Sequence, residues 1–154
     1  MRTILFLLLS MPSLLFGQIV IDEVGDGWKA KVDSAIQLIK TNAPEAYRVL
    51  EENTNHIEFW IGDMSTTAPD PKKGKGTILI AVDEIELGIY NLAAVLVHES
   101  LHLHFHRKGI KMDPIQEEIT AYAWEKLFLI QLPNCPMWLI QNADFQIRQL
   151  SEKR

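Results

Sequence analysis

Residues 91–109 read NLAAVLVHESLHLHFHRKG, a largely apolar run that carries His98, Glu99 and His102. The asparagine that opens the run suits a helix N-cap, and the glycine that closes it suits the position after the last turn. Together they predict a helix of about 17 residues. Histidines four residues apart lie one turn apart on the same helix face, so both imidazoles can reach one metal ion. The glutamate between them would lie beside the metal, where it can take a proton from water.

The same run has a second interpretation, a buried helix with two unrelated histidines. That interpretation does not account for Glu99, because a glutamate is rarely placed in a strongly apolar stretch without a partner. We therefore take a metal site on this helix as the working hypothesis and look for further ligands elsewhere in the chain.

Composition and charge limit the class of protein. The chain has 154 residues, of which 47 % are hydrophobic and 23 % charged, which is typical of one globular domain with a sizeable core. The formal net charge of −5 argues against nucleic acid and anionic membranes as partners. Cys135 is the only cysteine, so no internal disulfide is possible. Its place between prolines indicates a half-buried small residue rather than a ligand.

The N-terminus has the pattern of a secretory signal peptide. A basic residue precedes a short apolar segment, and the small residue Gly17 precedes Gln18. We therefore expect residues 1–17 to be removed and residues 18–154 to form one domain, secreted or periplasmic and free of the membrane. An uncleaved membrane anchor is the alternative, but the apolar run is short and a proline interrupts it.

The spacing of apolar residues predicts two helices and two strands before the central helix. The helices are expected at Trp28–Lys40 and from Pro44 to about Glu52, where apolar residues recur at helical intervals. The strands are expected at His56–Ile61, which alternates apolar and polar residues, and at Thr77–Val82, which is apolar and rich in β-branched residues. The polar stretch Gly62–Gly76 between them is expected to be an exposed loop.

Two more helices are predicted after the central one. Pro114 suits the first helical position and Asp113 suits the N-cap before it, so a helix is expected to run to about Leu132. A last helix is expected from Pro136. The chain is therefore predicted to be an α+β protein, mainly helical, with a short β-sheet beside the central helix.

A catalytic zinc ion normally has three protein ligands, so a third ligand is needed beyond the two histidines. The extended pattern H-E-x-x-H-x-x-G-x-x-H fails, because Phe105 and Lys108 stand where it requires glycine and histidine. His106 lies further along the same straight helix, which cannot wrap around one ion, and His104 points to another face. Asp113 is available but is well explained as a helix cap.

Glu117 and Glu118, in the first turn of the following helix, are the remaining candidates. Acidic residues in a first turn also suit the helix dipole without any metal, which easily explains one of the two. Ala121, three residues after Glu118, and the nearby Ala123 are small enough to let the two helices approach closely. Glu118 is therefore preferred as the third ligand, with Glu117 as the alternative.

The motif of the central helix, followed by Glu118 and Ala121 on the next helix, resembles the gluzincin branch of the zincin metallopeptidases. The resemblance covers about Thr77 to Leu132 and includes the order strand, active-site helix, glutamate helix. It implies a small zincin-like domain in which the strand Thr77–Val82 pairs with extended substrate. Tyr122 stands where some relatives have an aspartate that orients a histidine, so that support must come from another residue.

By this resemblance His98, His102 and Glu118 hold Zn²⁺ and Glu99 is the general base. The chain is then expected to be an exported zinc metallopeptidase that hydrolyses peptide bonds in a peptide or protein substrate. The alternative is an exported metal-binding domain without proteolytic activity, which acts as a binding module, and a weaker one is a metal-free helical scaffold.

Three side chains remain open as donors to the oxyanion that forms during hydrolysis. They are Tyr90, Tyr122 and His106, each of which carries a polar hydrogen on or near the central helix.

Overall fold

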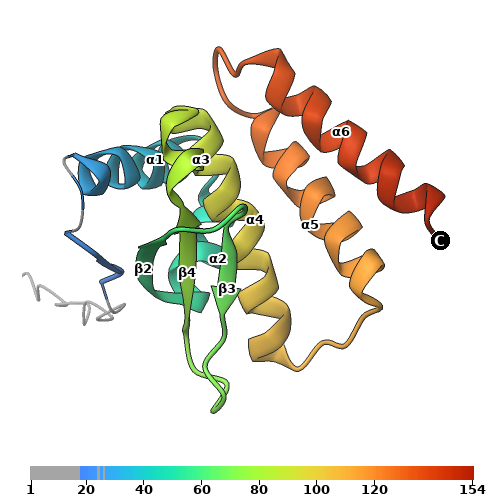
Figure 1. Ribbon diagram of the computed structural model, residues 1–154, viewed down its shortest axis with the longest axis horizontal. Helices are drawn as coiled ribbons and strands as arrows, with labels where there is room; N and C mark the ends of the chain where they lie inside the picture. Colours follow the sequence, from blue (N-terminus) through green and yellow to red (C-terminus); the bar gives the residue numbers. More distant parts are fainter. Residues whose placement is uncertain (1–17, 24, 26) are drawn as a thin grey trace, which may run out of the picture.

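The computed structural model describes residues 18–23, 25 and 27–154. The signal peptide predicted for residues 1–17 lies outside the described residues. The described chain folds into helices packed on one small four-stranded sheet (Figure 1). The predicted α+β class, mainly helical with a short sheet beside the central helix, is confirmed.

The elements follow one another in the order β1, α1, α2, β2, β3, β4, α3, α4, α5, α6. The strands are β1 (Val20–Ile21), β2 (Thr54–Trp60), β3 (Thr66–Ala68) and β4 (Gly76–Ala81). The helices are α1 (Trp28–Asn42), α2 (Pro44–Asn53), α3 (Val82–Glu86), α4 (Ile89–Lys108), α5 (Pro114–Leu129) and α6 (Met137–Glu152).

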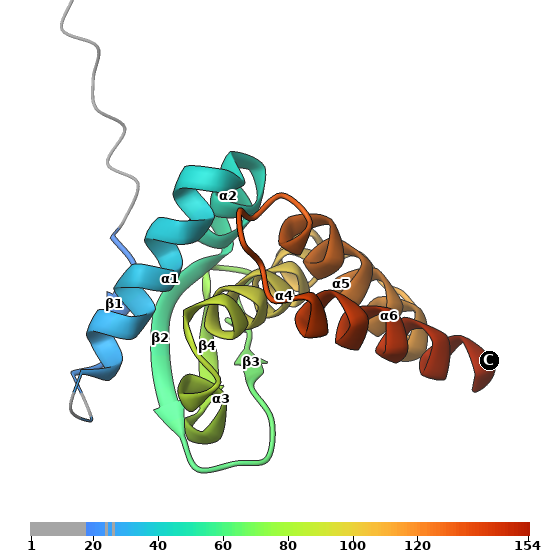
Figure 2. The ribbon, with the colours of Figure 1, turned by 90° about the horizontal axis from the view of Figure 1, so that it is seen from above.

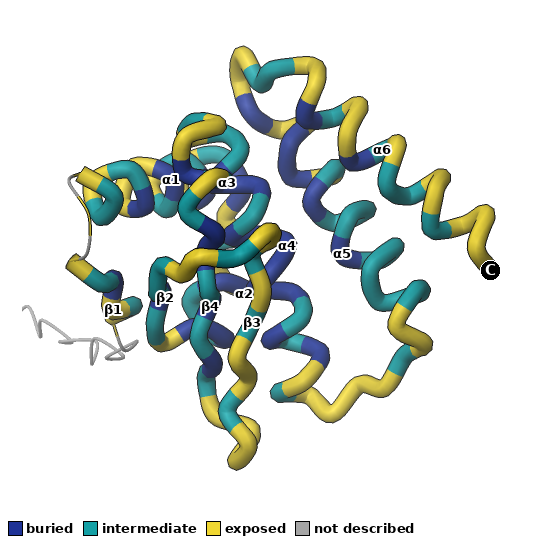
Figure 3. The backbone as a smooth tube through the Cα atoms, viewed as in Figure 1, coloured by how far each residue is buried: buried dark blue, intermediate teal, exposed yellow. Residues whose placement is uncertain are grey.

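Helix α4 is the centre of the fold and is buried along most of its length (Figure 3). It begins three residues earlier than predicted, after Gly88, whose φ of 100° is accessible to glycine at little cost. Asn91 is therefore not the N-cap, and its Nδ2 instead donates to the Glu84 carbonyl. The end of the helix is as predicted, with Gly109 in the left-handed conformation at φ 66°.

The helices lie in layers around α4. Helices α1 and α2 pack on one flank of α4, and the α5–α6 hairpin lies on its other side (Figure 2). Ala121 of α5 is fully buried in a cluster with Leu101 and Phe105 of α4, so the close approach predicted from the small residue is confirmed. None of the described helices is long and apolar enough to cross a bilayer.

The sheet differs from the prediction at its edge. The strand order is β1-β2-β4-β3, with β2 parallel and β3 antiparallel to β4. The prediction of a loop over Gly62–Gly76 was wrong for Thr66–Ala68, because three residues among glycines and prolines are too few to show alternation. The strand predicted at Thr77–Val82 is paired on both sides, so it cannot take substrate as an edge strand. Within the described chain, β3 holds that edge position.

Two further short elements were not predicted. Strand β1 has two residues and helix α3 has five, and neither is long enough to establish a period in the sequence. Helix α5 ends at Leu129 rather than near Leu132, because the last residues before Pro133 form turns. These differences matter for function, because β3 and α3 both border the site described next.

Candidate metal centre

Two neighbouring helices bring the predicted metal-binding side chains together. His98 and His102 lie one turn apart on α4, with ring centroids 5.0 Å from each other. Glu118 reaches them from α5, with 3.4 Å from its Oε2 to His98 Nε2 and 3.5 Å from its Oε1 to His102 Nε2. One ligand atom from each of the three residues lies within 4.8 Å of the other two.

These separations suit a small divalent cation. A tetrahedral zinc ion with bonds of about 2.0–2.1 Å places its ligand atoms roughly 3.3 Å from one another. The nitrogen-to-oxygen distances of 3.4 and 3.5 Å end at different oxygens of Glu118 and are close to that value. The three ligand atoms, which lie within 4.8 Å of one another, would move closer together around an ion. Two imidazole nitrogens and one carboxylate also form a donor set that zinc accepts, with a fourth position left for water or substrate. The residues present therefore fit the ion that the sequence motif implies.

The outer nitrogen of each histidine is held by a carboxylate from α5. His98 Nδ1 donates to Glu125 Oε2 at 3.0 Å, and His102 Nδ1 donates to Glu117 Oε1 at 2.8 Å. These bonds orient both rings so that Nε2 carries the free lone pair when the ring is neutral. Glu117, the alternative third ligand, contacts the outer nitrogen of His102, whereas Glu118 lies against the inner nitrogens of both rings.

The support of the two rings by Glu117 and Glu125 was not predicted from the sequence. The resemblance places such a support four residues after Glu118, and that position holds Tyr122. Glu125 lies seven residues after Glu118, two full helical turns, and therefore points to the same face. A glutamate seven residues after a proposed ligand, in an otherwise apolar helix, is a sequence signal that could have identified Glu125. In the structure Glu125 is only 7 % exposed.

Hydrogen bonds between α4 and α5 shift the pKa values of His98 and Glu118. Burial alone would lower the pKa of His98, but its hydrogen bonds to Glu118 and Glu125 outweigh burial and raise that pKa to about 10. The same hydrogen bond from His98 lowers the pKa of Glu118, against the effect of burial. The two carboxylates therefore favour positive charge at the His98 ring, and a metal ion at Nε2 would have to take the place of the proton there.

Glu99 stands beside this group without a partner of its own. The residue is 9 % exposed, and no hydrogen bond or ion pair to its carboxylate occurs within the described chain. Burial raises the pKa of Glu99, and the neighbouring His98 and His102 partly offset that effect. A buried carboxylate that borders a cavity and lacks a donor is suited to accept a proton from a bound molecule.

The site opens into a cavity of about 680 Å³. Its floor is the face of α4 that carries His98, Glu99 and His102, and α5 contributes its glutamates and Tyr122. Strand β3 and the preceding loop form another wall, and α6 adds Leu139. The volume lies within the range of small-molecule and peptide sites.

Of the three candidate oxyanion donors, only Tyr122 borders this cavity. Its ring packs edge-on against His98, with centroids 4.5 Å apart. Burial, followed by the surrounding carboxylates, raises the pKa of Tyr122 to about 12, so the hydroxyl keeps its proton at neutral pH. Tyr90 is directed elsewhere and donates to the Pro133 carbonyl.

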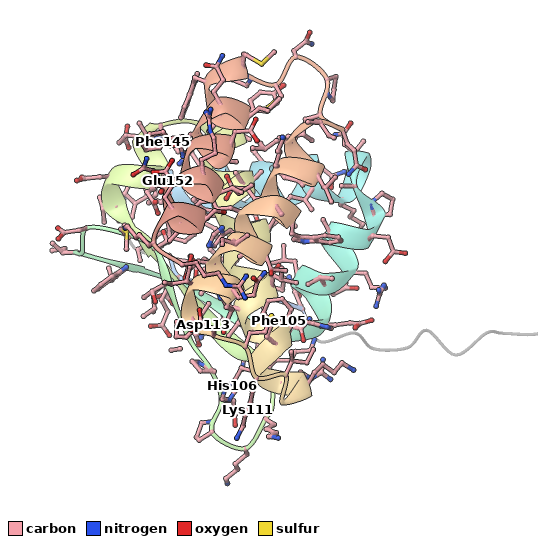
Figure 4. The ribbon with its side chains drawn as sticks, turned by 90° about the vertical axis from the view of Figure 1, so that its right-hand side faces the viewer. Phe105, His106, Lys111, Asp113, Phe145 and Glu152 are labelled. Carbon is pink, nitrogen blue, oxygen red and sulfur yellow. The ribbon has the colours of Figure 1, made fainter. Side chains whose placement is uncertain are left out.

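The other candidate ligands lie away from the site. His106 contacts the Asp70 carbonyl at the exposed end of α4, near the β3–β4 turn (Figure 4). His104 Nδ1 lies 3.4 Å from the side chain of Asn53. Asp113 caps α5 by accepting from two backbone N–H groups, as predicted. Cys135 is half-buried near the α5–α6 turn, in agreement with its predicted environment.

No protein-family model, curated protein or solved structure matches the chain. The likeness to the gluzincins therefore stays a prediction from the motif.

Proposed function

We propose that the protein is a zinc-dependent peptidase with His98, His102 and Glu118 as metal ligands and Glu99 as the general base. One observation carries this proposal. Three ligand atoms converge from two helices, and a buried carboxylate with no partner among the described residues stands beside them in an open cavity. A metal site that only stabilises a fold usually has four protein ligands and no need of a general base. These features favour the enzyme over the alternative of a metal-binding module without activity.

The side chains divide the work of hydrolysis among them. When bound, zinc would lower the pKa of a water molecule and polarise the scissile carbonyl. Glu99 accepts the proton that the attacking water loses and passes it to the leaving amine. Glu125 and Glu117 keep the two imidazoles in the required orientation during this exchange.

The substrate in this proposal is an extended peptide. Thr66 and Thr67 of β3 border the cavity, and β3 is paired with β4 on one side only within the described chain. The unpaired backbone groups of an edge strand can bind an extended segment by main-chain hydrogen bonds. In this proposal β3 binds the substrate, in place of the strand Thr77–Val82 that the resemblance implies.

The proposal is tested by elemental analysis of the purified protein and by cleavage of a peptide library with and without a chelator. We expect about one zinc ion per chain, cleavage of peptides, loss of cleavage with the chelator and recovery on adding zinc. Bound zinc without any cleavage would support the binding module instead. A protein that neither binds zinc nor cleaves would support the metal-free scaffold.

Tyr122→Phe is expected to lower kcat by roughly 10- to 100-fold, with little change in KM. The hydroxyl would hydrogen-bond the oxyanion that forms only during the reaction, so its loss affects the transition state more than substrate binding. Steady-state kinetics on one library-derived peptide measure the effect. Tyr90→Phe is the matched control, because Tyr90 contacts a backbone carbonyl outside the cavity. Equal kcat in the wild type and Tyr122→Phe would exclude this role.

A further inference from the structure

The cavity beside the metal-binding group is strongly acidic. Six carboxylate side chains border it, and within the described chain no lysine or arginine does. The six are Asp63, Glu84, Glu99, Glu117, Glu118 and Glu125. A divalent cation would offset two of these charges, so the occupied site would still repel an anionic ligand and attract a cationic one.

Glu84 has no part in the proposed chemistry, yet the fold holds its carboxylate firmly at the cavity wall. Its Oε2 accepts from the Ser65 backbone N–H at 3.1 Å and also from the Ser65 hydroxyl. The Ser65 hydroxyl oxygen in turn accepts from the Ala81 N–H at 3.0 Å. Within the described chain, no cation pairs with Glu84 and its Oε1 has no donor. A fixed carboxylate with a free oxygen is prepared to bind a positively charged group.

Glu84 lies at the opposite end of the cavity from His102. The cavity follows α4 from Asn91 to His102, and Asn91 is bonded to the backbone of Glu84. The seven residues from Asn91 to His98 correspond to about 10 Å along a helix. An extended peptide covers that distance with roughly three residues, so one short peptide can reach from the Glu84 end of the cavity to His98.

Glu99 provides an independent indication that a ligand enters. It is buried, borders the same cavity, and has no partner among the described residues. An ionisable side chain in that position depends on a molecule in the cavity, water or ligand, for its hydrogen bonds. The cavity therefore has one carboxylate without a protein donor at its middle, Glu99, and a second with a free oxygen at its α3 end, Glu84, among the described residues.

We propose that Glu84 determines specificity by binding a cationic group of the substrate, either a lysine or arginine side chain or a free amino terminus. The inference rests on the proposed function, because it assigns the substrate class of that same cavity. It places the cationic group near the α3 end and the bond to be cleaved near His98, with the peptide chain along β3 between them.

Binding of labelled peptides to the zinc-loaded Glu99→Gln protein tests this inference without turnover, and repeating it without zinc makes it independent of the metal. The peptides are matched in length and carry either lysine or norleucine at one position, with a free or acetylated amino terminus. We expect the cationic peptides to bind about tenfold more tightly, with a preference that shrinks as salt rises. If replacing lysine by norleucine abolishes the tighter binding, the bound cation is the side chain. If acetylation abolishes it, the bound cation is the amino terminus.

Glu84→Gln in the same background is expected to remove the tenfold preference while neutral peptides bind as before. Glu86→Gln is the matched control, because Glu86 lies on the same short helix but pairs with Lys31 at the surface. If cationic and neutral peptides bind the unaltered Glu84 cavity equally, or if the preference survives Glu84→Gln, the inference is wrong. The comparison of cationic with neutral peptides uses the protein with Glu84 intact. It therefore tests the inference even if Glu84→Gln does not fold.

The two proposals fail in different ways. A charge preference in binding without cleavage by the wild type would overturn the peptidase and leave the Glu84 subsite standing. Cleavage of cationic and neutral peptides at equal kcat/KM would overturn the subsite and leave the peptidase standing.

Discussion

Glu99→Gln is expected to lower the rate of peptide hydrolysis by about 10²- to 10⁴-fold while zinc stays bound. The amide has nearly the shape of the carboxylate, so the packing of α4 should persist. It cannot accept the proton of the attacking water, which is the step assigned to Glu99. Because Glu99 makes no hydrogen bond within the described chain, its replacement removes none there, and the loss of rate would reflect chemistry.

Three measurements separate this effect from damage to the site. Elemental analysis should give the wild-type zinc content, and peptide binding should be retained, so the loss should fall on kcat. The control is Glu86→Gln, which makes the same chemical change on the exposed surface of α3. If Glu99→Gln cleaved peptides as fast as the wild type, another group would have to be the base.

The local signals in the sequence were sufficient for the main elements. The apolar run from Asn91 to Gly109 predicts the central helix because a buried helix needs apolar residues on every face. Its glycine end is reproduced in the structure. The start is not, because Asn91 has an alternative partner in the carbonyl of Glu84, and that contact depends on how α3 folds back on α4. Tertiary context therefore overrode a sound local preference.

The metal centre, too, was predictable where it depends on local helix geometry and not where it depends on tertiary contacts. The spacing of His98 and His102 on one helix predicts their shared face from helix geometry alone. The choice between Glu117 and Glu118 depends on the crossing of α4 and α5, which sequence spacing does not determine. The structure places Glu118 against both inner nitrogens and Glu117 against an outer one.

The acidic end of the cavity could not be predicted at all. Ser65 and Glu84 are far from the histidine motif in sequence and meet because β3 returns antiparallel along β4. Strand β3 has only three residues in a polar stretch. A contact that depends on so short a strand has no periodic signal in the sequence.

Glu118→Ala is expected to lower zinc affinity by more than about 100-fold. Loss of a residue that only supports a metal ligand typically costs 10- to 100-fold in affinity, and removal of a ligand should cost more. Among the described residues, only the Glu118 carboxylate pairs with the inner nitrogens of both histidines. Competition with a chelator of known affinity measures the change, and zinc content after dialysis gives an independent value.

Two matched variants make the result specific to Glu118. Glu117→Ala removes the neighbouring carboxylate, which contacts only the outer nitrogen of His102, and Glu125→Gln weakens the support of His98. Both should lower affinity by about 10- to 100-fold, which is less than the effect of Glu118→Ala. Unchanged zinc stoichiometry in Glu118→Ala, with loss of zinc in Glu117→Ala, would reverse the assignment of the third ligand.

Thermal unfolding gives a second measure of how far zinc binding depends on Glu118. Zinc that binds only the folded protein raises its stability by an amount set by the ratio of free zinc to Kd, about 2.7 kcal/mol at a hundredfold excess over Kd. The wild type should therefore melt at a higher temperature with zinc than without it, and Glu118→Ala should lose most of that shift. A shift of equal size in both proteins would mean that zinc binds the folded chain without Glu118.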